Sequence, residues 1–206
     1  MKGQFADYSE KAYLEAVQEM RSKLRKKLKP DRYEHSLSVS FTAVCLAMRH
    51  GADLRQAEIA GLVHDCAKQF SNEELLERCA KHHVEISEEM RKAPQVIHAE
   101  YGAFFARKSY GIEDPEILSA IRYHTLGRAE LSLLEAIIFT ADYIEARRSK
   151  AERLPLIRCL AFSDLDRCIY EIMHDTIRYL EKSGSYVCGD CLSAYQYYQK
   201  RQEESK

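Results

Sequence analysis

Four histidines and two aspartates have the side chains and the placement needed to bind metal ions. They are His35, His64, Asp65, His98, His124 and Asp142. Imidazole nitrogens and carboxylate oxygens are common ligands of first-row transition metals, and each of the six falls at or beside an apolar stripe of a predicted helix. Six ligands are more than one tetrahedral site uses. They match an octahedral iron, manganese or magnesium centre, or a pair of ions that share Asp65.

The adjacent pair His64 and Asp65 lies at the end of an apolar helix. Side chains that face a core recur there with the i, i+3, i+4, i+7 spacing, at Ile59, Leu62, Val63 and Cys66. A carboxylate beside such a core costs several kcal/mol unless a cation or strong donors satisfy it. Successive helix residues point about 100° apart, so the pair can hold one ion. The alternative is a buried His–Asp pair that makes only local hydrogen bonds.

The spacing of the six residues predicts how a fold would gather them. Apart from the adjacent pair, they are separated by 18 to 33 residues, which places them on different helices. The interior of a helical bundle can collect such side chains, as it does in carboxylate-bridged metal proteins. The helices that carry them should therefore converge.

Two helices are predicted before the His64–Asp65 pair. The first covers residues 9–29 and ends at a proline. The second covers residues 31–49, with Asp31 as its N-cap and Gly51 after its last turn. Its main buried stripe is predicted to be Leu37, Phe41, Val44 and Met48, widened by Val39, Ala43 and Leu46.

Capping residues and prolines mark the later helices. The signals are a capping box at Ser71 and Glu74, Pro94 before the helix of His98, Asp114–Pro115 before the helix that leads to His124, and a capping box at Ser132 and Glu135. The last box opens a predicted helix of residues 133–148, in which Asp142 lies beside an apolar stripe. A helix over residues 165–182 and a terminal helix capped by Asp190 complete the chain.

The pattern predicts an all-α fold, a helical bundle. No segment shows convincing strand alternation, and 8 glycines and 4 prolines in 206 residues are too few for a β-sandwich or barrel. A chain of this length can bury one substantial core. We predict a single domain over residues 1–206, with its core at about 31–150 and C-terminal helices at about 164–201 packed on it.

Composition restricts the partners and the compartment. With 31 basic and 32 acidic residues the net charge is −1, so no global field attracts nucleic acid or an anionic membrane. No apolar run approaches the roughly 20 residues of a membrane span, and no signal-peptide core is seen. Seven cysteines, an odd number, suit reduced thiols. We expect a cytoplasmic protein with a small-molecule partner, and a homodimer is the oligomer to consider.

Five blocks of sequence closely resemble the YqeK-type branch of the HD-domain superfamily of metal-dependent phosphohydrolases. The order His35, His64–Asp65, Asp142 is the pattern of that superfamily. The blocks are residues 32–36 (RYEHS), 64–68 (HDCAK), 98–103 (HAEYGA), 123–125 (YHT) and 141–145 (ADYIE). The HD pair alone is a weak signal, but five blocks in order over residues 31–195 are specific. The fold implied is the HD-domain helical bundle.

The resemblance implies a bis(5'-nucleosyl)-tetraphosphatase, an iron-binding hydrolase that splits diadenosine tetraphosphate symmetrically into two ADP. It implies one or two iron ions, with manganese or magnesium as alternatives. The core ligands implied are His35, His64, Asp65 and Asp142. Metal-activated water would then attack an inner phosphorus.

The resemblance also assigns roles around the metal site. His98 and His124 would bind a second ion or the substrate phosphates, or one of them would protonate the leaving oxygen. From charge and position, and not from the resemblance, Lys68 and Arg148 are our candidates for clamps that hold the phosphates and neutralise the departing charge. The alternative for Lys68 is a lysine that only favours a helix C-terminus. The residues expected to take part in catalysis are Asp65, Lys68, His98 and His124.

Two other classes of function fit the same ligands. Some di-iron HD proteins cleave C–C or C–P bonds with dioxygen, using a similar set of six residues. A nucleotide-binding regulatory module without turnover is the other class. Unused buried carboxylates would be a standing cost to such a module, so hydrolysis is the preferred interpretation.

Overall fold

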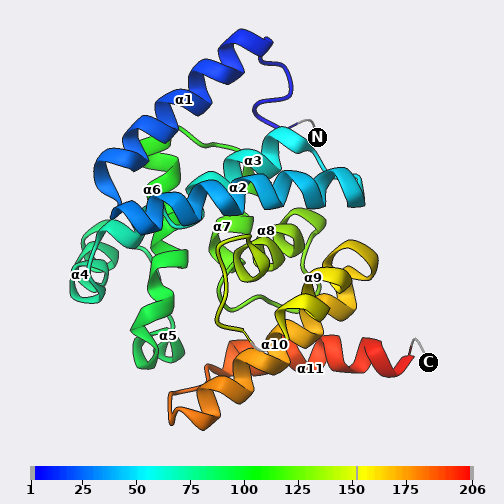
Figure 1. Cartoon of the computed structure of the whole chain (residues 1–206). Coiled ribbons are helices and arrows are strands. Elements are labelled where there is room, and N and C mark those ends of the chain that lie inside the picture. Colours follow the sequence, from blue (N-terminus) through cyan, green and yellow to red (C-terminus); the bar gives the residue numbers. More distant parts are fainter. Residues whose placement is uncertain (1–2, 152, 205–206) are drawn as a thin grey trace.

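The computed structural model describes residues 3–151 and 153–204, and within them it contains helices and connecting turns but no strand (Figure 1). The predicted all-α class is confirmed. None of the described helices has the length and apolar character to cross a membrane. The α-helices are α1 (Glu10–Lys27), α2 (Pro30–His50), α3 (Leu54–Val63), α4 (Asn72–His82), α5 (Glu88–Lys92), α6 (Ile97–Tyr110), α7 (Pro115–Tyr123), α8 (Leu133–Ile144), α9 (Leu154–Ser163), α10 (Leu165–Lys182) and α11 (Gly189–Glu204), and two 3₁₀ helices are η1 (Cys66–Gln69) and η2 (Pro94–Val96).

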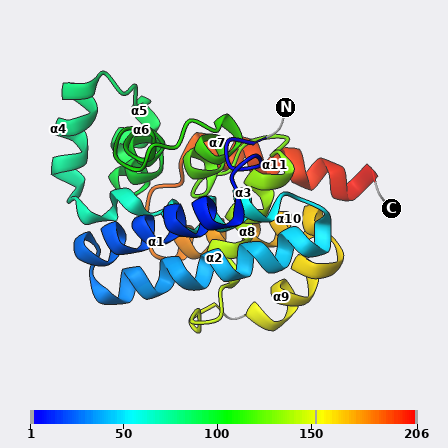
Figure 2. The ribbon, with the colours of Figure 1, turned by 90° about the horizontal axis from the view of Figure 1, so that it is seen from above.

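The helices of the metal-binding candidates pack on one another. Helix α2 packs against α3 and α8, and α7 contacts α3, α6 and α8. Helix α10 lies against α8, α9 and α11. Helices α4 and α5 lie toward one end of the molecule and the C-terminal end of α11 lies at the other (Figures 1 and 2). The centre of the bundle is therefore formed by the helices that carry the six candidate residues.

Most helix ends follow the predicted capping chemistry. Both capping boxes form, before α4 and before α8, and the Asp114 carboxylate accepts from the first backbone N–H groups of α7. Gly51 ends α2 in the left-handed conformation. The prediction for Asp31 was wrong: α2 begins at Pro30, whose fixed φ suits the first helical position, and its N-cap makes no side-chain hydrogen bond.

Helix α8 is shorter than predicted. It ends at Ile144 because Glu145 adopts φ −47° and ψ 155°, which leads the chain out of the helix. Arg148 therefore lies in the following turn. Two other helices, α5 and α9, were not predicted. Helix α5 has five residues, none of them buried, so its sequence shows no apolar periodicity. Helix α9 follows an irregular segment.

The buried face of α2 differs from the predicted stripe. Phe41 and Met48 are 57% and 61% exposed, whereas the buried residues are Ser36, Val39, Ser40, Ala43, Leu46 and Ala47. The reason is the close approach of α3. A Cβ atom on Gly61 would lie 2.8 Å from the Cα atom of Ser40, so only small side chains fit where the two helices cross. Val39, Ala43 and Leu46, which were predicted only to widen the stripe, are the residues that are buried in the core.

One cluster of buried apolar side chains extends from Phe5 to Tyr198. It includes residues of α1, α2, α3, α6, α7, α8, α9, α10 and α11. This continuity supports the prediction of a single domain over residues 1–206, which stays a prediction. Residues 1, 2, 152, 205 and 206 of that range lie outside the described part.

Candidate metal centre

The structure brings the six predicted residues together from six helical segments. His64, Asp65, His98 and His124 are buried, and the side chains of His35 and Asp142 are 12% and 26% exposed. Their positions are the second turn of α2 for His35, the C-cap of α3 for His64, the N-cap of η1 for Asp65, the first turn of α6 for His98, the C-cap of α7 for His124 and the last turn of α8 for Asp142. Their roles as ligands remain a prediction.

One half of the cluster is formed by His35, His64 and Asp142, whose ligand atoms lie within 4.8 Å of one another. The Nε2 atom of His35 lies 2.9 Å from Oδ1 of Asp142. The Nε2 atom of His64 lies 3.9 Å from the same oxygen and 3.5 Å from Oδ2 of Asp65. These atoms point toward one small volume.

The other half is formed by His98, His124 and the second oxygen of Asp65. The two Nε2 atoms lie 3.2 Å apart. Oδ1 of Asp65 lies 3.2 Å from Nε2 of His98 and 3.6 Å from Nε2 of His124. Asp65 thus faces the first half with Oδ2 and the second half with Oδ1.

Backbone carbonyl groups fix the orientation of three of the imidazoles. The Nδ1 atoms of His64, His98 and His124 each donate to the carbonyl three residues earlier, at 2.7 Å. With the proton on Nδ1, the Nε2 atom of each neutral ring presents a lone pair to the cluster. The Nε2 atoms of His98 and His124 therefore face each other as two acceptors. This arrangement is the one found when a metal ion lies between imidazoles.

The unsatisfied acceptors show that the residues fit a metal ion. Nε2 of His64 and Oδ1 of Asp65 are buried and make no hydrogen bond within the described part of the chain. Buried acceptors without donors are costly, and a cation removes that cost. Ligands about 2.1 Å from one ion lie up to about 4.2 Å apart, so the separations within each half suit coordination. The histidine and aspartate cluster of this fold therefore indicates metal ions.

The pKa values of Asp65, Asp142 and His98 favour the forms that bind metal ions. His35 differs: burial would lower its pKa, but its contacts with Asp142, Asp65 and Glu145 raise it. Burial alone would raise the pKa of Asp65, but the imidazoles of His64, His124 and His98 outweigh burial and hold it well below its usual range. Burial alone would also raise the pKa of Asp142, but the hydrogen bond with His35 lowers it. Burial lowers the pKa of His98 to about 4. Anionic carboxylates and neutral imidazoles are the forms that bind metal ions.

Two residues beside the cluster were missed in the sequence. NH1 of Arg32 lies 2.7 Å from Oδ2 of Asp65, and its side chain is 42% exposed. Oε1 of the buried Glu145 lies 3.2 Å from Nδ1 of His35 and orients that ring. Each is three residues from a candidate ligand: Arg32 precedes His35 on α2, and Glu145 follows Asp142 directly after the end of α8. That spacing could have found them.

The two predicted phosphate clamps lie at the edge of the cluster. NH2 of Arg148 donates to the backbone carbonyl of Asp142 at 2.9 Å and lies 3.5 Å from Oδ1 of the same residue. Nζ of Lys68 donates to the carbonyl of Gln95 at 3.4 Å. Burial lowers the pKa of Lys68, opposed by the charges of Asp65 and Asp142. Arg148 thus lies beside one candidate ligand, and Lys68 is near enough for the charges of two to act on it.

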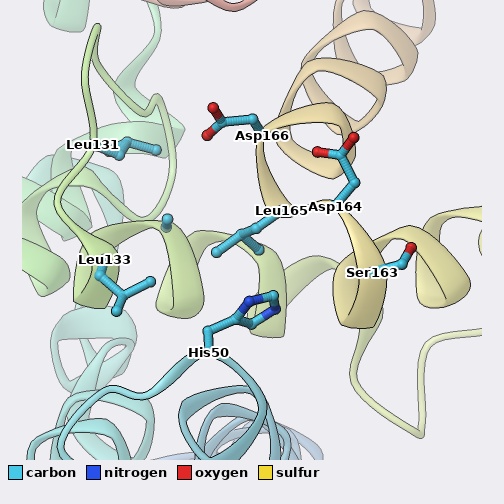
Figure 3. A pocket seen from close by; sticks show the side chains of 8 residues that line it. His50, Leu131, Leu133, Ser163, Asp164, Leu165 and Asp166 are labelled. Carbon is cyan, nitrogen blue, oxygen red and sulfur yellow. The ribbon is translucent and has the colours of Figure 1, made fainter.

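A larger pocket lies away from the cluster, between the end of α2, the start of α8 and the junction of α9 and α10. It has a volume of about 560 Å³, and Figure 3 shows His50, Leu133 and Leu165 around it with two aspartates at its edge. Its polar groups stabilise the fold: His50 bonds to the carbonyl of Ala161, Asp164 caps α10 and Asp166 pairs with Arg201. Volume alone therefore does not identify the functional site.

Removing bound metal should destabilise the protein. A ligand that binds only the folded state stabilises it by mass action, and without it Asp65 and His64 keep unsatisfied buried acceptors. We expect the melting temperature to fall by ~5 °C or more on chelation, measured by calorimetry on samples of verified metal content. In an Asp65→Asn/Asp142→Asn double variant the chelator should have no effect. Equal melting of loaded and stripped wild-type protein would contradict a metal centre.

Comparison with known proteins agrees with this geometry. The family model of the HD domain matches residues 32–147. The chain is 37% identical over 164 residues to the symmetrical bis(5'-nucleosyl)-tetraphosphatase of Halalkalibacterium halodurans, covering 80% of this chain and 87% of that protein. It is 36% identical over 172 residues to the enzyme of the same name from Bacillus subtilis, covering 84% and 91%.

A solved structure has the same fold. The crystal structure of a predicted HD superfamily hydrolase involved in NAD metabolism, from Clostridium acetobutylicum, superposes with a TM-score of 0.86 at 36% identity, covering 89% of this chain and 97% of that one. The resemblance found in the sequence is confirmed. The chain belongs to the HD domain family and, within it, to the group that contains the symmetrical bis(5'-nucleosyl)-tetraphosphatases.

Proposed function

We propose that the protein is a metal-dependent hydrolase that splits diadenosine tetraphosphate into two ADP. The observation that carries the proposal is the two-sided cluster, in which Asp65 presents one oxygen to each half. Relatives that are 36% and 37% identical to this chain over the aligned residues bear the name of that activity. The substrate is therefore a small nucleotide.

We assign one ion to His35, His64, Asp65 and Asp142, and a second to Asp65, His98 and His124. Iron is the metal that we propose, because histidine-rich sites with open positions suit it. Bound ions would lower the pKa of a coordinated water toward 7 and neutralise charge on phosphate oxygens. Side chains of the protein would position the phosphates and stabilise the charge of the departing ADP.

Three cations at the edge of the cluster would position the phosphates. Arg32 reaches Asp65, Arg148 reaches Asp142, and Lys68 is close enough for both carboxylates to affect its pKa. Guanidinium groups bind phosphate through paired, charge-assisted hydrogen bonds. We propose that these three groups hold the bridge and stabilise the charge of the departing ADP.

The geometry favours His98 and His124 as ligands over proton donors. Each uses its Nδ1 proton on a backbone carbonyl, and the lowered pKa of His98 keeps its Nε2 atom unprotonated at neutral pH. A group without a proton on the atom that faces the substrate cannot protonate the leaving oxygen. Arg32, Lys68 and Arg148 would stabilise that oxygen by charge instead.

The products of diadenosine tetraphosphate test the proposal. Attack at an inner phosphorus that breaks the central anhydride gives two ADP, whereas attack at an outer phosphorus gives AMP and ATP. We expect ADP alone by chromatography, at the same rate with and without dioxygen. AMP with ATP would contradict symmetrical cleavage, and turnover that requires dioxygen would favour an oxygenase. Metal-stripped protein is the control and should form no ADP.

Replacing Arg32 should weaken substrate binding. Arg32→Ala removes one charge-assisted contact, worth about 1.5–3 kcal/mol, so KM for diadenosine tetraphosphate should rise roughly tenfold or more. Arg147→Ala is the matched control, because Arg147 is also an exposed arginine but lies 3.9 Å from Glu34 and contacts none of the six candidates. A normal KM for Arg32→Ala, with its metal content intact, would show that Arg32 only holds Asp65.

A further inference from the structure

Arg158 on α9 holds the turn that follows Asp142. Its guanidinium donates to three backbone carbonyl groups, from Nε to Ile144 at 2.9 Å and from NH2 to Glu145 at 2.9 Å and Arg148 at 3.1 Å. We propose that Arg158 is a positioning residue, which fixes this turn and thereby places the side chains of Glu145 and Arg148 at the metal centre. This inference rests on the proposed function and extends it to a residue outside the centre.

The end of α8 depends on two arginines. The last carbonyl groups of an α-helix have no partner within the helix. NH2 of Arg148 donates to the carbonyl of Asp142 at 2.9 Å, and Nε of Arg158 donates to that of Ile144. Positive charge is also favourable at this negative end of the helix dipole. The two guanidinium groups therefore hold the last turn of α8, the turn that carries Asp142.

Helix α9 gives Arg158 a fixed position. The helix packs on α2, α8 and α10, and Ile157 and Ala161 on either side of Arg158 in the sequence are fully buried. Sγ of Cys168 on α10 lies 3.5 Å from the carbonyl oxygen of Ile157 and donates to it. Because the core fixes α9, its guanidinium is a rigid support for the turn and not a mobile surface charge.

The first side chain placed by the turn is the carboxylate of Glu145. It is buried, its Oε1 lies 3.2 Å from Nδ1 of His35, and its Oε2 accepts from the N–H of Arg147 at 2.7 Å. Glu145 has non-helical backbone angles, so α8 alone does not fix its direction. Partners of this kind orient an imidazole ligand, and their loss typically costs roughly 10–100-fold in metal affinity.

The second side chain is the guanidinium of Arg148. Its backbone N–H donates at 3.0 Å to the carbonyl of Glu145, the same carbonyl that Arg158 binds. Its NH2 lies 3.5 Å from Oδ1 of Asp142. Its Nε is buried and makes no hydrogen bond within the described part of the chain. A buried donor of this kind needs an acceptor, and a phosphate oxygen would supply one.

Binding of Mn²⁺, followed by calorimetric titration, tests the metal side of the proposal. In Arg158→Ala the affinity for one of two ions should fall about tenfold, because His35 loses its orientation. Glu145→Ala should have the same effect. The double variant should lose no more than either single variant, since both substitutions act on one imidazole.

The KM for diadenosine tetraphosphate at saturating Mn²⁺ tests the phosphate side. Arg158→Ala and Arg148→Ala should each raise KM roughly tenfold, and the double variant should raise it no further. Arg158→Lys keeps the charge, but one ammonium group does not reproduce the fork of three bonds. Its values should lie between those of the wild type and Arg158→Ala, and it replaces Arg158→Ala if that variant does not fold.

Arg153→Ala is the matched control. Arg153 directly precedes α9 and pairs with Glu171 and Asp175 of α10, so its loss should change neither Mn²⁺ affinity nor KM. Unchanged values in both Arg158 variants, or additive losses in the two double variants, would show that Arg158 only stabilises the fold. A wild-type protein that does not cleave diadenosine tetraphosphate would contradict the proposed function, and the Mn²⁺ titrations would then decide the role of Arg158.

Discussion

Asp65→Ala should reduce the metal content of the purified protein to background and abolish hydrolysis of diadenosine tetraphosphate. Asp65 faces each half of the cluster with a different carboxylate oxygen. Its Oδ2 lies 3.5 Å from Nε2 of His64 and its Oδ1 lies 3.2 Å from Nε2 of His98. Removing its carboxylate takes a ligand from both proposed ions at once. Elemental analysis and activity on the same sample measure the two effects.

Asp114→Ala is the matched control for this substitution. Asp114 is as buried as Asp65, but it caps α7 and accepts from Gln56. Its loss should lower the free energy of unfolding by about 1 kcal/mol, the typical cost of a lost cap, and leave the metal content intact. If Asp65→Ala retained as much metal as the wild type, the ligand assignment would be wrong.

The six candidate residues could be found from the sequence because metal ligands break a pattern. A histidine or aspartate in an apolar helical stripe has a cost that only a partner removes, so each was visible in its own segment. Their gathering into one cluster follows from the bundle. The division into two halves required the structure, because it depends on which oxygen of Asp65 faces which imidazole.

Errors in the predicted fold arise where a contact with another helix decides the outcome. The sequence of α2 favours burial of Phe41 and Met48 by hydrophobicity, yet the close approach of Gly61 to Ser40 turns the small residues inward. Which face of α2 is buried depends on the helices that pack on it, so the sequence of α2 alone does not determine it. The same holds for Arg32, whose contact with Asp65 joins α2 to η1.

Helix ends were predicted better than helix faces because their signals are local. The Ser71 and Ser132 capping boxes each place both partners within four residues. Glu145 shows the limit of that rule. It ends α8 early because its carboxylate accepts from the N–H of Arg147 and faces His35, and His35 is 110 residues distant.

His98→Ala and His124→Ala should lower turnover far more than nucleotide affinity. Both residues direct Nε2 to the same point beside Asp65, where we place the second ion. Charge at that point matters most as the anhydride breaks, so its loss acts on the transition state. We expect kcat to fall ~100-fold or more, since even residues that only orient metal ligands cost 10–100-fold.

Metal stoichiometry and binding distinguish this role from a simple substrate contact. Each variant should retain the ion of His35, His64 and Asp142 and lose the other, so metal per chain should fall by about half relative to the wild type. ADP affinity should change little. His174→Ala serves as the control, because His174 lies beside Asp175 on α10, outside the cluster. Full metal content with a large loss of ADP affinity would instead place His98 and His124 on the phosphates, and the centre would then hold a single ion on His35, His64, Asp65 and Asp142.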